Sequence, residues 1–275
     1  MVAFKHSIFA LPFALMSLIT AAGASWPAPR TWAWIVVAMV AARTAAMSFN
    51  RLVDHEIDAA NPRTTGRSLP AGRLSRRFAW TVTVVASVTF VVAAGMLNRL
   101  CLVLAPPTLT WLLGYSYAKR FTATAHLWLG LALGFAPLGA WVAETSELAW
   151  PPAILGAAVA FWVAGFDTIY SLQDEAFDRS HGLFSLPARL GAGHALAVSR
   201  GFHALAVIGF AVFAVAAGGG WIRLSAVAAA AALIFWQHRL VRPSDLSAVN
   251  AAFFTANGML SVIMLVLFVI AKATS

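Results

Sequence analysis

The stretch RTAAMSFNRLVDHEIDAANPRTTGRSLPAG, residues 43–72, decides the fold because it places acidic and basic side chains at the end of an apolar helix. At about 100° per residue, Asn50, Asp54 and Asp58 lie within about 80° of one another on one helical face. A carboxylate within a lipid-embedded helix costs roughly 2.5–3.5 kcal/mol on insertion scales, so two on one face imply a cation, an arginine or a water-filled cavity. This stretch is therefore the first candidate for an active site.

A second stretch, DTIYSLQDEAFDRSHG at residues 167–182, repeats the pattern. Asp167, Asp174 and Asp178 are spaced so that they share one helical face within about 40°, and Tyr170 flanks it. Seven of the ten acidic residues of the chain lie in these two stretches. Solvated helix ends would not gather acids in this way, so both stretches are predicted to act together.

The composition predicts a polytopic membrane protein. Hydrophobic residues make up 61% of the chain and charged residues 11%, against roughly 25% charged residues in a soluble domain. The net charge of +9 does not imply nucleic acid, because the basic residues lie between apolar segments, where they set topology and meet anionic lipid or substrate. The single cysteine, Cys101, excludes an intramolecular disulfide.

Apolar segments long enough to cross a bilayer predict an all-α fold with nine transmembrane helices around a central cavity. The predicted spans are residues 7–24, 32–53, 78–97, 101–118, 126–143, 152–173, 195–217, 221–237 and 248–271. The second and sixth spans each carry carboxylates at their ends, and similar turns follow them, SLPAGRL from Ser68 and SLPARLG from Ser185. These spans are candidates for copies of one four-helix unit in a parallel repeat.

The basic residues predict the orientation. With a cytoplasmic N-terminus, thirteen lie in inner segments and four in outer ones, as the positive-inside rule requires. The inner ones are Lys5, Arg51, Arg63, Arg67, Arg73, Arg76, Arg77, Lys119, Arg120, Arg179, Arg189, Arg239 and Arg242; the outer ones are Arg30, Arg99, Arg223 and Lys272. Both acidic stretches then face the cytoplasm, the C-terminus lies outside, and a bacterial inner membrane is the expected location.

Two carboxylate clusters among basic residues suit a polyanion bridged to the protein by hard divalent cations. Mg²⁺ takes oxygen ligands, keeps several waters and commonly completes its shell with substrate phosphates. If the cavity also opens to lipid, a diphosphate with a long apolar tail fits both of its halves. The predicted substrate is therefore a polyprenyl diphosphate.

The segment NRLVDHEID at residues 50–58, followed by NPRT at 61–64, resembles the first aspartate-rich motif of the UbiA superfamily of intramembrane prenyltransferases. Residues 167–178 resemble the second motif. The resemblance extends to the helix count, the KHSIFALPFA opening and the YSYAKR segment before the fifth span, so it covers essentially the whole chain. It implies one transmembrane domain over residues 1–275.

The resemblance implies Mg²⁺-dependent transfer of a polyprenyl group to an aromatic ring. The sequence is most similar to 4-hydroxybenzoate polyprenyltransferases of ubiquinone synthesis and to menaquinone-pathway enzymes that prenylate 1,4-dihydroxy-6-naphthoate, and both acceptors stay open. The implied metal ligands are Asp54, Asp58, Asp174 and Asp178, with Asn50 beside them, and the implied diphosphate ligands are Arg63, Arg67, Lys119 and Arg120. Asp167 and Tyr170 would line the cavity where the allylic cation meets the acceptor.

Arg43 is predicted to face the same cavity as Asn50, roughly 10 Å deeper along the helix. It is either a structural partner of an acid such as Asp167 or, as the 4-hydroxybenzoate branch implies, the anchor for the acceptor's carboxylate. The ring proton could leave to Asp167 or to the released diphosphate. The histidines, His126 among them, show no metal-ligand spacing and are assigned to packing or the membrane interface.

A secondary transporter is the main alternative from another class, because acidic and basic residues within membrane helices also mark ion paths. Transporters commonly place such carboxylates near the midplane of the bilayer, whereas these lie at the predicted cytoplasmic ends. The position of the acids therefore favours the enzyme.

Overall fold

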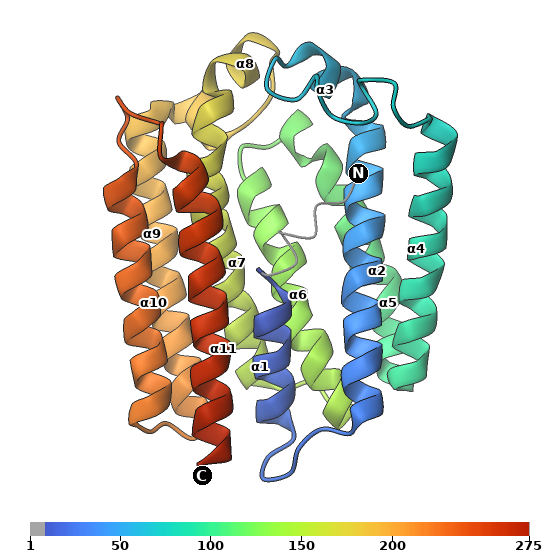
Figure 1. Ribbon diagram of the computed structural model, residues 1–275, viewed down its shortest axis with the longest axis vertical. Helices are drawn as coiled ribbons and strands as arrows, with labels where there is room; N and C mark the ends of the chain where they lie inside the picture. The colour runs from blue at the N-terminus through green and yellow to red at the C-terminus, as the bar shows by residue number, and fades with distance from the viewer. Residues whose placement is uncertain (1–8, 275) are drawn as a thin grey trace.

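The computed structural model describes residues 9–274, and within this range the chain is helical and forms no β-strand. The long helices run side by side between two ends of the molecule (Figure 1). They are α1 (Leu11–Ala21), α2 (Pro29–Val53), α4 (Arg76–Leu97), α5 (Arg99–Gly114), α6 (Ala125–Thr145), α7 (Trp150–Ser171), α9 (Leu186–Ala216), α10 (Trp221–Leu240) and α11 (Asn257–Ala273). The all-α membrane fold is confirmed.

Seven segments of the described chain are long and apolar enough to cross a membrane. They are Pro29–Val53, Arg76–Leu97, Arg99–Arg120, Ala125–Thr145, Trp150–Ser180, Leu186–Ala216 and Ala251–Ala273. The predicted count of nine is not confirmed. The first predicted span begins outside the described residues, and the helix within it, α1, has 11 residues. The eighth corresponds to α10, whose middle is mostly alanine and whose ends are polar.

The two acidic stretches leave the helix bundle at the same end. The short helix α3 (His55–Ala60) follows α2, and α8 (Glu175–Ser180) follows α7 after a 3₁₀ turn at Leu172–Asp174. Both short helices lie at the top of Figure 1, which agrees with the predicted parallel repeat. The seventh predicted span starts too late: α9 begins at Leu186, and a break at Gly191, whose φ is +78°, separates its first turn from the rest.

Backbone hydrogen bonds continue across the bend between α2 and α3 and keep Asn50, Asp54 and Asp58 on one face. The Asp54 amide donates to the Asn50 carbonyl at 2.9 Å, and the Asp58 amide donates to the Asp54 carbonyl at 2.7 Å. The three side chains therefore keep the helical spacing, although two separate helices carry them.

Helices α6 and α7 approach backbone to backbone. A Cβ atom on Gly130 would collide with the Ala160 carbonyl oxygen, and one on Gly134 would collide with the Gly156 carbonyl oxygen. Only glycine allows this approach, which is typical of helix pairs in membranes. It brings the beginning of α6 against the end of α7, where Asp167 lies.

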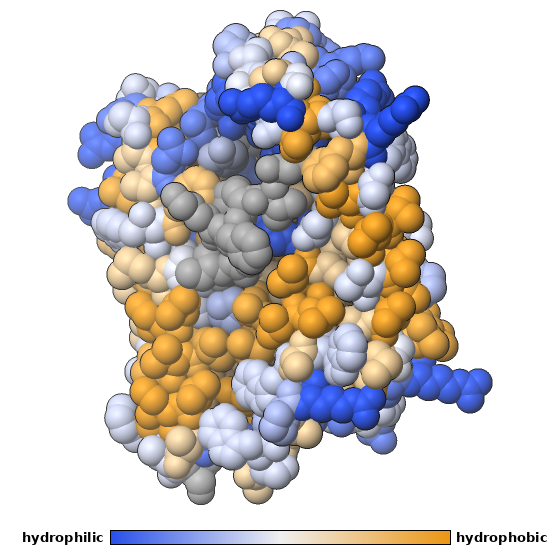
Figure 2. All heavy atoms as spheres, turned by 45° about the vertical axis from the view of Figure 1, so that its right-hand side comes forward, coloured by the Kyte–Doolittle hydropathy of each residue, from blue (hydrophilic) through white to orange (hydrophobic). Residues whose placement is uncertain are grey.

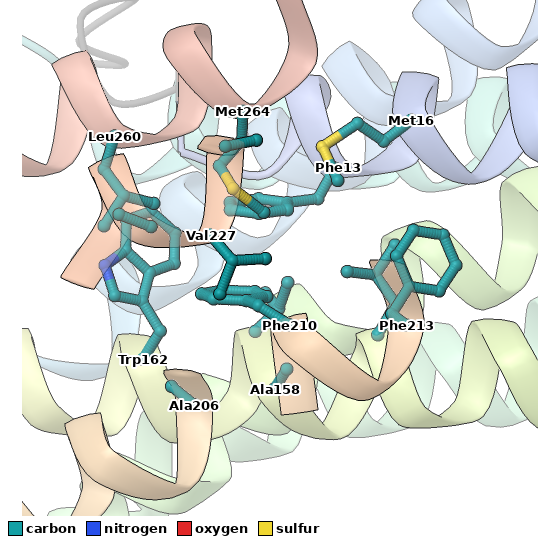
Figure 3. Packing of buried hydrophobic residues seen from close by; sticks show 14 of the residues in the cluster. Phe13, Met16, Ala158, Trp162, Ala206, Phe210, Phe213, Val227, Leu260 and Met264 are labelled. Carbon is teal, nitrogen blue, oxygen red and sulfur yellow. The ribbon is translucent and has the colours of Figure 1, made fainter. Parts of the chain in front are cut away.

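Large buried side chains of α1, α7, α9 and α11 fill the core of one half of the bundle (Figure 3). Phe13 stacks on Phe210 with ring centroids 5.3 Å apart and lies edge-on to Trp162 at 5.1 Å. Apolar side chains also cover much of the outer face shown in Figure 2, and charged ones gather toward its ends. On α4 the exposed apolar residues include Val84, Val85 and Val88. This outer surface is suited to lipid.

A π-helical turn, Ala251–Ala256, precedes α11. Buried side chains bind the carbonyl groups of this turn: the Gln237 amide donates to the Ala252 carbonyl, and the Asn257 amide donates to the Phe253 carbonyl, both at 2.9 Å. Trp162 of α7 donates to the Asn257 amide oxygen at 3.0 Å. The turn places Phe253 against Tyr170, with ring centroids 4.3 Å apart.

Candidate active site

A cavity of about 640 Å³ lies among α1, α2, α4, α5, α6 and α7. Its lining is almost entirely apolar, and its charged members are Arg43 of α2 and Asp167 of α7. Tyr115, at the end of α5, also lines it, and Phe253 closes part of the wall. The cavity therefore extends the two acidic faces inward, because α2 and α7 carry both its charged residues and the acidic stretches.

Asp54 caps the end of α2. The Asn50 amide donates to its Oδ2 at 2.8 Å, and the Arg120 guanidinium lies 3.6 Å from its Oδ1. Burial, followed by the charge of Asp58, raises the pKa of the Asp54 carboxyl, although the basic residues nearby act in the opposite direction. Burial therefore outweighs the basic residues that lie near Asp54, and a ligand with positive charge would favour its ionised form.

Asp58 of α3 is buried between two arginines of its own stretch. Arg67 lies 2.5 Å from its Oδ1, and Arg51 lies 3.4 Å from its Oδ2. Both contacts are local, since the partners are 9 and 7 residues away in the sequence. Asp58 is therefore the carboxylate with the most complete set of charged partners.

Asp174 joins the two acidic stretches. The Arg63 guanidinium binds both of its oxygens, one of them through Nε at 2.8 Å, and the Asn61 amide donates to it at 3.0 Å. Arg63 also donates to the Tyr170 hydroxyl at 3.1 Å. Burial disfavours the charge on Arg63, but the hydrogen bond to Asp174 and the acid's charge, together with Tyr170, raise the pKa of the guanidinium.

Asp178 of α8 is 2% exposed, and its nearest basic group is Lys119 at 3.8 Å. Its Oδ2 is buried and has no hydrogen-bond donor among the described residues. An orphaned carboxylate oxygen is costly in a buried site, so this position is suited to a ligand that brings positive charge.

Asp167 contacts a histidine for which residue spacing predicted only a packing or interfacial role. The His126 Nδ1 lies 2.6 Å from the Asp167 Oδ2, and His126 Nε2 accepts a hydrogen bond from the Leu186 backbone amide at 3.3 Å. His126 is almost fully buried on α6. No pattern within one helix predicts this contact, because α6, α7 and α9 each supply one member.

The donor set fits Mg²⁺ in its chemistry. Two pairs of carboxylates spaced four residues apart offer oxygen ligands, and one of those oxygens is orphaned. Within residues 9–274, no three acidic, histidine or cysteine side chains converge closely enough to form a complete cage. Mg²⁺ is usually bound by one or two carboxylates together with waters and substrate phosphates.

The structure brings nine of the predicted site residues together at one end of the bundle. They are Asn50, Asp54, Asp58, Arg63, Arg67, Lys119, Arg120, Asp174 and Asp178. Tyr170 borders this group, and the other two, Arg43 and Asp167, line the cavity. The roles that the sequence suggested for all of them stay predictions.

A carboxylate and arginine site above an apolar cavity in a helical bundle defines an integral membrane enzyme for a substrate that is both anionic and apolar. The model of the UbiA prenyltransferase family matches residues 10–259 of the chain. The chain therefore belongs to the UbiA prenyltransferase family and is a prenyltransferase.

Relatives agree with this assignment. The chain is 28% identical to 4-hydroxybenzoate octaprenyltransferase of Vibrio vulnificus over 243 residues, which cover 85% of this chain and 82% of the relative. It is 35% identical to a UbiA homolog from Aeropyrum pernix, whose apo structure superposes with a TM-score of 0.89 and covers 98% of this chain and 99% of the homolog.

A second solved structure shares the fold at lower sequence identity. A UbiA homolog from Archaeoglobus fulgidus, bound to GPP and Mg²⁺, has a TM-score of 0.74 at 17% identity and covers 98% of this chain and 96% of that one. The fold is thus common to distant members of the family.

Proposed function

We propose that the protein transfers a polyprenyl group from a polyprenyl diphosphate to 4-hydroxybenzoate in a Mg²⁺-dependent reaction of ubiquinone synthesis. The main observation behind this proposal is that two different environments adjoin. Four carboxylates with arginines lie at one end of the bundle, and an apolar cavity of about 640 Å³ lies directly inward of them. The name of the relative from Vibrio vulnificus supports the acceptor.

The diphosphate would lie between the two acidic stretches. Asp54, Asp58, Asp174 and Asp178 would hold Mg²⁺, which when bound supplies positive charge to the diphosphate oxygens. Arg63, Arg67, Lys119 and Arg120 already lie against those carboxylates and can turn to the substrate. They would stabilise the negative charge that grows on the diphosphate as the allylic C–O bond breaks, its electron pair leaving with the oxygen.

The acceptor would lie in the cavity near Arg43. A guanidinium can hold a carboxylate through two parallel hydrogen bonds, which fixes the aromatic ring as well as binding it. The electron-rich ring then attacks the allylic carbon, a C–C bond forms, and the ring carbon loses its proton. Asp167 and Tyr170 border this region.

A second candidate acceptor is 1,4-dihydroxy-6-naphthoate of menaquinone synthesis, which also carries a carboxylate for Arg43. The same site would serve both acceptors. We place the protein in the bacterial inner membrane, with the acidic stretches in the cytoplasm and the C-terminus outside, because thirteen basic residues against four favour that orientation.

The test is transfer by membranes that contain the protein. Membranes receive radiolabelled octaprenyl diphosphate, Mg²⁺ and one of the two acceptors, and the lipid-soluble product is identified by mass. We expect prenylated 4-hydroxybenzoate, and none from membranes that carry Asp54→Asn. Product only from the naphthoate would select the alternative acceptor, and no product from either would refute the proposal.

A further inference from the structure

His126 and Asp167 form a pair in which the hydrogen-bond partners of the imidazole favour one tautomer. The Leu186 backbone amide can only donate a hydrogen bond, so His126 Nε2, at 3.3 Å, accepts with its lone pair. A neutral imidazole then carries its proton on Nδ1 and donates it to Asp167 Oδ2 at 2.6 Å. The start of α9 thereby selects the tautomer that binds the acid.

This contact restricts the Asp167 side chain. Its Oδ2 is engaged by a residue that is 1% exposed, while the side chain of Asp167 itself is 20% exposed toward the cavity. The imidazole is in turn held on α6, which packs on α7 through the glycine contacts described above. The bond to His126 therefore fixes Asp167 Oδ2, and Oδ1 can bind a molecule in the cavity.

We infer that His126 is a positioning residue for the transfer reaction, which holds Asp167 so that Oδ1 accepts the proton from the prenylated ring. In that step the ring C–H bond breaks, its electron pair restores the aromatic ring, and the proton binds Asp167. This inference rests on the proposed function and assigns the proton to Asp167 rather than to the released diphosphate.

An aspartate that is not held by His126 would be a less effective base. A displacement of about 1 Å in a reacting group can lower a rate about 100-fold, so a second bond that fixes the rotamer of the base contributes directly to kcat. We expect binding of the polyprenyl diphosphate to change little without His126, because the proposed diphosphate ligands Arg63 and Arg67 pair with Asp174 and Asp58.

The test compares three substitutions of His126 in the full chain. In His126→Gln, the amide can donate to Asp167 while its oxygen accepts from Leu186, so both bonds are kept. His126→Leu has neither group, and His126→Asn is too short to span both partners. His203→Leu is the matched control, since His203 is also 1% exposed but bonds to His238 and the Trp162 carbonyl instead of to Asp167.

For His126→Leu and His126→Asn we expect kcat to fall about 10–100-fold while the KM for octaprenyl diphosphate stays within about 2-fold. His126→Gln and His203→Leu should keep kcat within about 5-fold of wild type. Adding His126→Leu to Asp167→Asn should change the rate little further, because the two act as a unit. If His126→Leu does not accumulate in membranes, His126→Asn carries the comparison.

Two results would overturn the inference. Wild-type kcat in both His126→Leu and His126→Asn would show that the bond to Asp167 is dispensable. An equal fall in kcat for His126→Gln would show that the imidazole acts other than by these two bonds. Failure of wild type to prenylate either acceptor is a different outcome, which refutes the proposed function itself.

Discussion

The two acidic stretches look alike in sequence but are neutralised in different ways. The first neutralises Asp58 by itself, through Arg51 and Arg67 at 7 and 9 residues' distance. The second draws the partners of its three aspartates from elsewhere in the chain. Arg63 and Asn61 reach Asp174 from 111 and 113 residues away, Lys119 faces Asp178, and His126 binds Asp167.

The difference shows that Asp58 is neutralised within its own stretch, whereas Asp54, through Arg120, and the aspartates of the second stretch depend on residues from elsewhere. Arg63 makes the charged connection between the stretches from the loop after α3, and Asn61 adds a hydrogen bond to the same aspartate. The two stretches therefore carry similar sets of acids without forming two equivalent sites. Substitutions in each stretch should distinguish neutralisation by local partners from neutralisation by distant ones.

The largest effect is expected from removing one acid of either stretch. Asp54→Asn and Asp174→Asn should each abolish transfer, as should EDTA, because neither stretch alone has enough ligands for a metal–diphosphate complex. The measurement is product formation by membranes with matched protein content. Asp245→Asn, at an exposed residue of the loop after α10, is the control. Full activity in either variant, or in EDTA, would contradict a shared metal site.

The next effect concerns the residue that connects the stretches. Arg63→Ala removes charge-assisted bonds worth about 1.5–3 kcal/mol, so kcat/KM for the polyprenyl diphosphate should fall about 10–150-fold. Arg179→Ala is the control, because Arg179 pairs with Glu175 on the exposed side of α8. An equal loss in both variants would mean that general positive charge, and not the bridge, is what the site needs.

A smaller and more selective effect is expected in the cavity. Arg43→Lys should weaken the apparent affinity for the aromatic acceptor about 10-fold and leave that for the polyprenyl diphosphate nearly unchanged, because a lysine cannot form the planar pair of hydrogen bonds. The measurement is the Michaelis constant for each substrate. Phenol, which has no carboxylate, should be a poor acceptor for wild type and lose little more in the variant. If both constants rise together, Arg43 is structural and the acceptor assignment loses its main support.

The smallest effect tests whether Arg51 and Arg67 can replace each other beside Asp58. Arg67→Ala leaves Arg51 beside Asp58, so activity should fall only about 2–5-fold, in line with the modest value of an ion pair whose arginine is partly exposed. The double variant Arg51→Ala with Arg67→Ala should fall much further. Transfer rates of the two single variants and the double variant decide the point, and additive losses would show that the arginines do not replace each other.

The helical faces could be predicted from the sequence because they depend on spacing within one segment. Asn50, Asp54 and Asp58 keep that spacing even where α2 ends, since hydrogen bonds between residues four apart continue through the bend. The gathering of arginines around them was predictable for the same reason. Local periodicity therefore predicted the acidic faces that the structure brings together at one end of the bundle.

Partners from other helices could not be predicted. Asn61 and His126 were missed as site residues, because their contacts with Asp174 and Asp167 depend on how distant helices pack. The early start of α9 was missed because hydropathy does not register the Ser185 cap or the break at Gly191. Hydropathy also counted α10 as a span, although polar residues near its ends, such as Arg223 and Arg239, keep it outside the segments that are long and apolar enough to cross a membrane.

The π-helical turn before α11 has a consequence for assembly. Its carbonyl groups are bound by Gln237 of α10 and by Asn257, which in turn needs Trp162 of α7. In a bilayer, an unbound carbonyl group is costly, so this segment reaches its final shape only after both neighbouring helices are in place. Phe253 belongs to this turn, so the part of the cavity wall beside Tyr170 depends on the same two helices.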